Sequence, residues 1–306
     1  MTATSVLTGL SAFPPTPIRD DEVDAGAFAL LVEMLAGSGV DSVTALGSTG
    51  SYVYFDRDER RRVVKLAVSA AGDVPVLAGV GHVRTREVLR HVEDAQAAGA
   101  RGLLLAPVTY QALTDDDVVG LFADVDAAAS VPVVVYDNPG TTHVSFSDEL
   151  HARISELDHV AAIKSPPVAG GVEVVRARVD SLRSVVAPEV SIGISGDPVA
   201  ADALVAGCDA WYSVLAGTLP GPCRAIVDAV AAGDADEAQR RSRQLDPLWR
   251  LFDAHGSYRV VAALAEEIGL VERPGLPRPV LGLDDAGRHD VRAALASLRQ
   301  EGLVDA

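Results

Sequence analysis

Two apolar runs, Val131-Pro132-Val133-Val134-Val135-Tyr136 and Val160-Ala161-Ala162-Ile163-Lys164, decide how this chain folds. Between them lies the turn-forming stretch Asp137-Asn138-Pro139-Gly140-Thr141-Thr142. Short runs of branched apolar residues bounded by turn residues are typical of strands buried on both faces, as in parallel sheets. Each run ends in one reactive side chain, the phenol of Tyr136 or the amine of Lys164, and parallel strands would bring both to one edge. The alternative is that Lys164 merely extends from the core into water.

Outward from this pair, strand-like and helix-like segments alternate. The predicted strands are Leu7–Phe13, Ser42–Leu46, Val76–Val80, Gly102–Ala106, Val133–Tyr136, Val160–Lys164, Val190–Ser195 and Ala210–Val214. The helices predicted between them are Ala25–Ala36, Asp58–Ala71, Arg86–Ala98, Asp115–Ala129, Asp148–Glu156, Val172–Ser181 and Pro198–Ala206. Eight strands with helical crossovers, about 25 residues per unit, predict an α/β fold of the (β/α)8 TIM barrel type. No Gly-x-Gly-x-x-Gly follows the first strand, which argues against a dinucleotide-binding sheet.

Signals at the helix ends support this division. Side chains that can accept hydrogen bonds from the first amides of a helix are Asp56, Thr85, Thr114, Ser147 and Asp197. Glycines that can take a left-handed conformation fall just past helix ends at Gly39, Gly72, Gly99 and Gly207. Local sequence therefore agrees with the apolar pattern at most of the predicted boundaries.

The end of the chain is helical in pattern. Pro220–Ala232 is the predicted last barrel helix, so we expect a catalytic barrel domain over residues 1–232 and a C-terminal helical extension over 233–306. The extension has predicted helices at Asp236–Ala254, Tyr258–Ile268 and Asp285–Arg299, with a Pro-rich loop at Arg273–Pro279.

Composition excludes several classes of partner. The chain has 306 residues, 48% of them hydrophobic, and a formal net charge of −17. An acidic surface repels nucleic acid and anionic membranes, so we expect neither as a partner, although a small anion can still bind in a local pocket. Cys208 and Cys223 lack metal-ligand spacing and are predicted to be buried free thiols. No signal segment and no apolar run of about 18 residues is present, so we expect a soluble cytoplasmic protein.

Polar residues cluster where the predicted strands end, which is where barrels of this kind carry their chemistry. Gly47-Ser48-Thr49-Gly50 follows the second strand and could present successive backbone amides to an anion, although an ordinary turn has the same composition. Tyr110 follows the fourth strand, Gly196 follows the seventh, and Ser213 lies at the end of the eighth.

These residue types point to one reaction. Burial disfavours the ammonium form of a lysine and lowers its pKa, so the free amine of Lys164 could attack a ketone and form an imine. Tyr136 could pass protons to and from substrate oxygens. The amides around Ser48 and Thr49 would bind an adjacent carboxylate. A 2-oxo acid such as pyruvate fits this arrangement, and neither a metal nor another cofactor is needed beyond the covalent imine.

The same residues carry a resemblance that covers most of the chain. The sequence resembles the family of dihydrodipicolinate synthase and N-acetylneuraminate lyase, which are pyruvate-dependent class I aldolases. The segments that carry the resemblance are Gly9–Pro17 with Asp24, Gly47–Gly50 with Glu59-Arg60, Ala78–Gly81 with Thr85, Ala98–Ala100, Leu103–Pro107, Tyr136–Pro139, Ile163-Lys164, Ser195–Asp197, and Gly207–Ala210 leading to Ser213-Val214. Each is weak alone, but the ordered set is specific.

The resemblance implies a role for each matching residue. Lys164 would form the imine, Tyr136 would relay protons, and Ser48 with Thr49 would bind the pyruvate carboxylate. A second tyrosine, borrowed from a neighbouring subunit, would be Tyr110, with Thr109 as the alternative position. We also expect substrate contacts from Gly47, Thr141, Gly196 and Ser213. The family implies a homotetramer built as a dimer of dimers.

The second substrate is less clearly defined. Where the synthase branch has an arginine for the carboxylate of aspartate semialdehyde, this chain has Thr141. Loss of that guanidinium, together with Gly-Ser-Thr-Gly, favours a 2-keto-3-deoxy sugar acid aldolase or lyase. Ser165-Pro166-Pro167 matches neither branch. Two alternatives stay open: the synthase reaction of pyruvate with aspartate semialdehyde, and a non-catalytic barrel that binds 2-oxo acids.

Overall fold

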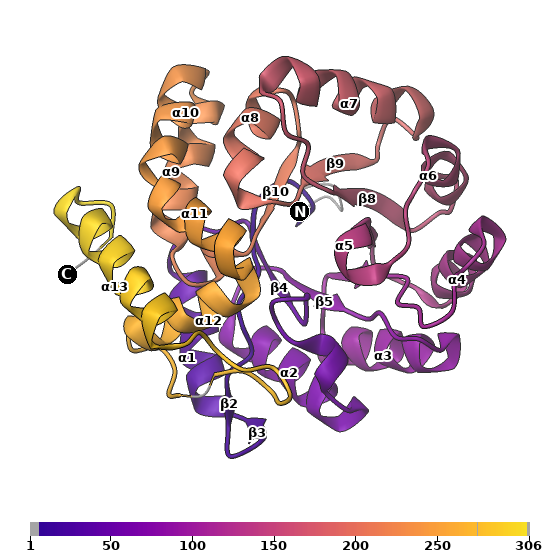
Figure 1. Ribbon diagram of the computed structural model, residues 1–306. Coiled ribbons are helices and arrows are strands. Elements are labelled where there is room, and N and C mark those ends of the chain that lie inside the picture. Colours follow the sequence, from indigo (N-terminus) through magenta and orange to yellow (C-terminus); the bar gives the residue numbers. More distant parts are fainter. Residues whose placement is uncertain (1–5, 274, 305–306) are drawn as a thin grey trace.

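The computed structural model describes residues 6–273 and 275–304, and its centre is a closed barrel of parallel strands (Figure 1). Neighbouring strands follow one another in chain order until β10 closes on β1. The strands are β1 (Gly9–Ala12), β4 (Ser42–Ala45), β5 (Val76–Gly79), β6 (Gly102–Leu105), β7 (Val133–Tyr136), β8 (Val160–Ser165), β9 (Ser191–Ile194) and β10 (Ala210–Ser213). The predicted (β/α)8 barrel is confirmed.

Helices surround the barrel because each has one apolar stripe (Figure 1). In α3 (Thr85–Ala98), Val88, Val92 and Ala95 recur at helical spacing and are buried. The other surrounding helices are α1 (Ala25–Ala36), α2 (Arg57–Ala70), α4 (Asp115–Ala128), α6 (Asp148–Ser155), α7 (Val172–Val185), α8 (Ala200–Val205) and α9 (Pro220–Ala231).

Most helix-end predictions are confirmed. Three of the predicted side chains accept a backbone N–H at the start of a helix: Asp56, Thr114 and Ser147. Thr85 does not, because α3 begins one residue earlier than expected, and the N-cap residue Arg84 makes no side-chain cap. Asp197 was also wrongly predicted as a cap: it begins the short 3-10 helix η3 (Asp197–Val199), and its carboxylate is bonded elsewhere. The four predicted glycines all have positive φ: Gly39, Gly72, Gly99 and Gly207.

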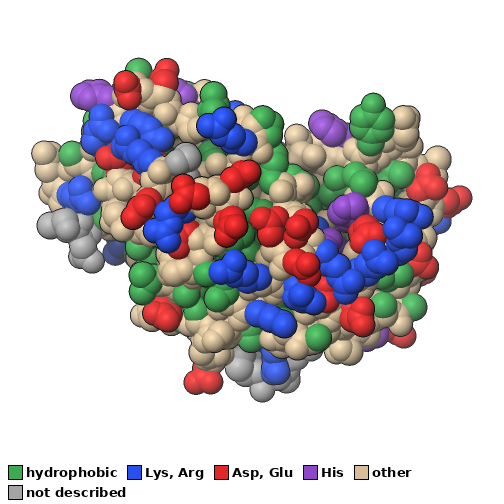
Figure 2. Space-filling model, turned by 90° about the horizontal axis from the view of Figure 1, so that it is seen from below, with side chains coloured by type: hydrophobic (Ala, Val, Ile, Leu, Met, Phe, Trp, Pro, Cys, Tyr) green, Lys and Arg blue, Asp and Glu red, His purple; other side chains and the backbone are tan. Residues whose placement is uncertain are grey.

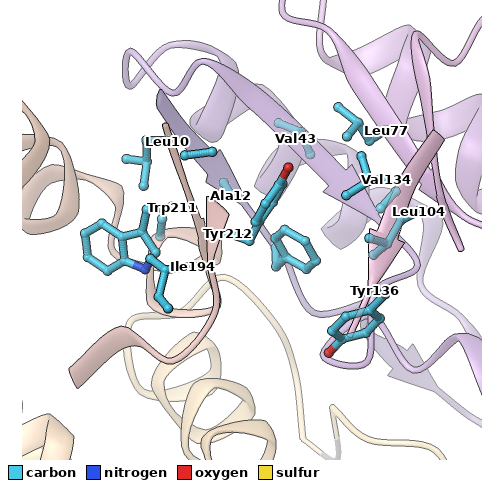
Figure 3. Packing of buried hydrophobic residues seen from close by; sticks show 14 of the residues in the cluster. Leu10, Ala12, Val43, Leu77, Leu104, Val134, Tyr136, Ile194, Trp211 and Tyr212 are labelled. Atoms are coloured by element: carbon cyan, nitrogen blue, oxygen red, sulfur yellow. The ribbon is translucent and has the colours of Figure 1, made fainter. Parts of the chain in front are cut away.

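Large aromatic side chains fill the barrel near its reactive end. Figure 3 shows Tyr212 among the strand residues, with its hydroxyl pointing away from Tyr136. Tyr212 is 1% exposed, and its ring meets that of Phe13 edge-to-face with centroids 6.0 Å apart. A Cβ on Gly193 would lie 2.4 Å from the Tyr212 ring, so β9 has a glycine there to make room. The aromatic rings give this end of the barrel a low dielectric environment.

The chain ends in four helices, α10 (Ala235–Gln244), α11 (Asp246–His255), α12 (Ser257–Glu267) and α13 (Asp285–Gln300). The prediction of one helix over Asp236–Ala254 is wrong. Pro247, in the first turn of α11, has no amide hydrogen and cannot continue the preceding helix, so the chain turns at Leu245. α11 contacts η3, and α12 contacts η4 (Leu215–Gly217), so these helices lie against the carboxyl ends of the last strands. The boundary between residues 232 and 233 stays a prediction.

Five short elements were not predicted: the hairpin strands β2 (Ile18–Arg19) and β3 (Glu22–Val23), the 3-10 helices η2 (Tyr52–Tyr54) and η4, and α5 (Pro139–Thr142). The Pro-rich segment 273–279 is irregular in its described residues, as expected, and Pro274 lies outside them. Cys208 and Cys223 are buried and free, which confirms that prediction.

The surface carries charges of both signs. On the face shown in Figure 2, Lys and Arg side chains are interspersed with Asp and Glu. Among the described residues no helix is both long enough and apolar enough to cross a bilayer.

Candidate active site

Lys164 and Tyr136 lie side by side at the reactive end of the barrel. They are Cα partners on the adjacent strands β8 and β7. Lys164 is 2% exposed, and its Nζ lies 4.8 Å from the centroid of the Tyr136 ring. The rings of Phe13 and Tyr212 lie 5.0 and 5.7 Å away. The amine therefore sits inside the barrel among aromatic faces and does not extend into bulk water.

This environment changes the protonation of the amine. Burial lowers the pKa of Lys164 from 10.5 to about 7, and the nearby Asp197 carboxylate opposes part of that effect. The neutral form is therefore well populated at pH 7, whereas an exposed lysine is neutral in roughly one molecule in three thousand. A neutral amine at this position can attack a carbonyl carbon.

A cavity of about 690 Å³ opens onto this amine. Of the residues predicted from the sequence, five contribute to its lining together with Lys164: Ser48, Thr49, Tyr136, Thr141 and Gly196. This volume is enough for a small oxo acid and a second reactant side by side. The structure thus brings together residues from the ends of β4, β7, β8 and β9 that lie far apart in the sequence.

The Tyr136 hydroxyl lies between two other polar groups. It is 3.2 Å from the Ser48 hydroxyl and accepts a 2.8 Å hydrogen bond from the Asn138 amide. A hydroxyl with a fixed donor on one side and a second hydroxyl on the other can pass a proton in either direction. Sequence analysis did not assign a role to Asn138, although it lies two residues after Tyr136.

The remaining predicted residues lie outside the cavity lining. Gly47 packs against Phe13, whose ring would be 2.6 Å from a Cβ at that position. Ser213 is buried behind the wall, where its hydroxyl accepts a 2.9 Å bond from the amide of Ala216. Tyr110 is 92% exposed, so its side chain is accessible to a neighbouring subunit.

Asp197 is a further polar residue of the site, although the sequence predicted it only as a helix cap. Its carboxylate is 3% exposed and accepts hydrogen bonds from the Trp211 indole at 2.8 Å and the Leu215 amide at 2.9 Å. Burial raises the pKa of Asp197, whereas these bonds and the charge of Lys164 lower it. The Ser195-Gly196-Asp197 pattern indicated a strand end, but only the folded chain places the carboxylate in the cavity beside the lysine.

The C-terminal helices supply part of the cavity wall. Phe252, Asp253, Ser257 and Tyr258 line it, and none was predicted. Among the described residues, Lys164 is the only cationic side chain in the lining, and Asp197 and Asp253 are its acidic ones. No group of three His, Cys, Asp or Glu suited to a metal occurs in the part of the chain that the structure describes. The expectation that no metal or cofactor is needed stays a prediction.

We expect Asp197→Asn to move the pH profile of imine formation to lower pH. The wild-type rate should rise through about pH 7 as Lys164 loses its proton, then level off. The Asp197 charge raises the pKa of Lys164, so its removal lowers that pKa and moves the rising limb toward acid. Borohydride trapping of bound pyruvate between about pH 5 and 9 measures the limb. If the rising part of the pH–rate profile stayed in place or moved to higher pH in Asp197→Asn, this prediction would be wrong.

A (β/α)8 barrel with a desolvated lysine where its strands end is the arrangement of an imine-forming lyase, and comparisons with known proteins agree. The family model described as the dihydrodipicolinate synthetase family matches residues 6–298. The chain belongs to this family. Family members are lyases or aldolases that work through a Schiff base, so the expected enzyme class is confirmed.

Individual relatives are similar along nearly the whole chain. A 4-hydroxy-tetrahydrodipicolinate synthase from Phenylobacterium zucineum is 30% identical, covering 94% of this chain and 95% of its own. One from Bifidobacterium longum is 31% identical over 91% and 92% of the two chains. The crystal structure of a dihydrodipicolinate synthase from Agrobacterium tumefaciens is 42% identical, with a TM-score of 0.93 and coverage of 97% and 99%.

Proposed function

We propose that this protein activates a 2-oxo acid, of which pyruvate is the simplest, as an imine on Lys164 and then makes or breaks a carbon–carbon bond. One observation carries the proposal: the buried amine, with a pKa of about 7, lies in the cavity lined by Tyr136, Ser48 and Thr49. The backbone of the turn at Ser48 and Thr49 would bind the carboxylate, which directs the ketone carbon to Lys164 Nζ.

The covalent steps balance with the groups present. The neutral amine of Lys164 attacks the ketone carbon, and the carbinolamine loses its oxygen as water with a proton supplied through Tyr136 and Ser48. Loss of a proton from the adjacent methyl group converts the iminium to an enamine. The enamine attacks an aldehyde carbon, whose oxygen takes up a proton. Water then hydrolyses the new iminium, releasing a 4-hydroxy-2-oxo acid and restoring the amine. Cleavage is the reverse.

The cavity wall favours an uncharged second reactant. Thr141 lines the cavity, and the resemblance implies an arginine at this position in the synthase branch, whereas Lys164 is committed to the imine. Hydroxyl and amide groups line the wall instead, from Asn138, Ser195 and Ser257 among others. Such groups suit the hydroxyls of a sugar-derived aldehyde. We therefore favour an aldolase or lyase acting on 2-keto-3-deoxy sugar acids.

The second candidate is the synthase reaction, in which pyruvate condenses with aspartate semialdehyde. The names of the Phenylobacterium, Bifidobacterium and Agrobacterium relatives support it. The two candidates differ in the charge that the second reactant brings into the cavity, so kinetics can separate them.

Borohydride trapping tests the imine directly. The sequence contains only two lysines, Lys65 and Lys164, and Lys65 is exposed on α2. Incubation with pyruvate and borohydride should add one reduced pyruvate, and peptide mass spectrometry should locate it on Lys164. Lys65→Met is the matched control and should trap as the wild type does. A wild-type protein that binds pyruvate without an adduct would support a non-catalytic barrel.

We expect Thr141→Arg to change the choice of aldehyde. With wild-type protein, pyruvate should react faster with uncharged hydroxyaldehydes than with aspartate semialdehyde. An added guanidinium should improve kcat/KM for aspartate semialdehyde relative to those aldehydes by roughly 10-fold or more, the value of one charge-assisted hydrogen bond. If wild-type protein consumed aspartate semialdehyde alone, the sugar-acid assignment would be wrong.

The assembly and location stay proposals. We propose a homotetramer in which Tyr110 of each subunit reaches a neighbour's cavity, supported by the 92% exposure of that aromatic side chain. Sedimentation of wild-type protein tests the tetramer. We also propose a cytoplasmic location, because an enzyme that uses 2-oxo acids needs a supply of them there.

A further inference from the structure

The turn that follows β4, residues 46–54, contains two non-glycine residues in an unfavourable backbone conformation. Leu46 and Ser51 both have left-handed backbone conformations, with φ of 59° and 62°. Residues other than glycine adopt that region only where their surroundings hold them there. A Cβ on Gly50 would lie 2.9 Å from the amide nitrogen of Leu46, so the middle of the turn packs closely against its first residue. Two backbone hydrogen bonds inside the turn, from the Ser51 amide to the Ser48 carbonyl and from the Tyr54 amide to the Ser51 carbonyl, hold Ser51, and contacts from outside the turn add to them.

One outside contact comes from the segment between β1 and β2. The Thr16 hydroxyl donates a 2.9 Å hydrogen bond to the Gly50 carbonyl, and both groups are buried. This bond fixes the middle of the turn from the side of β1. It does not reach the Ser51 side chain, which is itself polar and buried, with 1% exposure. A buried hydroxyl needs its own partner.

The partner comes from the far end of the chain. The hydroxyls of Ser51 and Tyr258 lie 2.7 Å apart although the residues are 207 positions apart in sequence. Tyr258 is the second residue of α12, close behind Gly256, whose φ of 79° allows the sharp start of that helix. Tyr258 also lines the cavity. One hydrogen bond thus connects the C-terminal helices to the turn that carries Ser48 and Thr49.

We propose that Tyr258 is a positioning residue for the oxo-acid carboxylate, because by holding Ser51 it sets the direction of the backbone amides at Ser48 and Thr49. The inference rests on the proposed function. Successive amides bind one carboxylate well only when they converge on it. Loosening the turn should therefore weaken binding of the oxo acid while leaving the reacting groups, Lys164 and Tyr136, in place. The C-terminal helices then control substrate affinity.

Tyr258→Phe tests this by removing the hydroxyl and keeping the ring. We expect the KM for pyruvate to rise about threefold to tenfold, the range of one net hydrogen bond. The kcat at saturating pyruvate should fall by a smaller factor than the KM rises, because Lys164 and Tyr136 stay in place and only the Ser48 hydroxyl of the relay lies on this turn. Ser51→Ala should raise KM equally. The double variant should be no worse than either single variant, because both changes remove the same hydrogen bond.

A matched control distinguishes the positioning role of Tyr258 from a general loosening of the C-terminal helices. Gln239→Ala removes a 2.8 Å hydrogen bond from α10 to Asp202 in α8, outside the cavity lining. It should leave the pyruvate KM unchanged even if the melting temperature falls. An unchanged KM in Tyr258→Phe, or additive effects in the double variant, would overturn the positioning role. If wild-type protein gave no adduct on Lys164, the proposed function would fail instead, so the two failures are distinguishable.

Discussion

Lys164→Met should abolish turnover and at the same time stabilise the protein. Without the amine no imine forms, and borohydride with pyruvate should leave the mass of the protein unchanged. The stability gain follows from the lowered pKa of Lys164, because each tenfold weakening of proton binding in the folded state costs about 1.4 kcal/mol at pH 7. Methionine has a similar length without the amine, so we expect a gain on the order of 1–4 kcal/mol at pH 7, reduced from the full value because Asp197 loses the charge of Lys164.

The sign of the pH dependence checks the cause of this gain. Between pH 7 and 10.5 the unfolded chain binds a proton at Lys164 and the folded chain does not, so wild-type stability rises with pH in that window. The advantage of the methionine variant should therefore be full near pH 7 and should fade as the pH approaches 10.5. Urea unfolding of both proteins across this range measures it. Lys65→Met, at an exposed site, should show neither effect, and full activity in Lys164→Met would end the proposed mechanism.

Tyr136→Phe should slow turnover by roughly 10²–10⁴-fold, the usual contribution of a positioned proton donor. The ring that packs 4.8 Å from the amine remains, so the change isolates the hydroxyl that contacts Ser48 and Asn138. The steps that need a proton at the substrate oxygen should slow: dehydration of the carbinolamine and hydrolysis of the final iminium.

Single-turnover kinetics distinguish this role from simple packing. The rate of imine formation with saturating pyruvate should fall together with kcat, whereas the KM for pyruvate should change little. The pKa that governs the acid limb should stay at about 7, because burial of Lys164 is unchanged. A variant with wild-type kcat would show that Ser48 or water supplies the proton without Tyr136.

Much of the barrel could be predicted from short-range patterns. The strand Val133–Tyr136 has the predicted bounds, and α1 (Ala25–Ala36) does too, because apolar spacing and turn residues are local properties. The pairing of Tyr136 with Lys164 follows from the same logic, since parallel strands point their carboxyl ends the same way. The break at Leu245 was also present in the sequence as Asp246-Pro247, but the apolar periodicity that continues across it concealed the signal.

The site could be predicted only where its residues lie at strand ends. Asn138 and Asp197 belong to segments that follow predicted strands, but the direction of a side chain after a turn depends on its neighbours in space. Asp197 was expected to cap a helix, a local role, yet Trp211 and Leu215 on the next strand and turn bind its carboxylate instead. Those partners cannot be inferred from spacing.

From the sequence alone one could determine the order of strands and helices, the reactive residues where the strands end, and the oxo-acid chemistry that those residues suit. Only the tertiary structure decided that the amine is desolvated, that Asp197 lies near it, and that the Tyr258 hydroxyl of the C-terminal helices meets Ser51 in the turn after β4. The physical reason is the sequence separation of the interacting groups. Hydrogen-bonded elements arise from neighbours along the chain, whereas desolvation, charge pairing and the closing of a cavity arise from groups that meet only when distant segments pack.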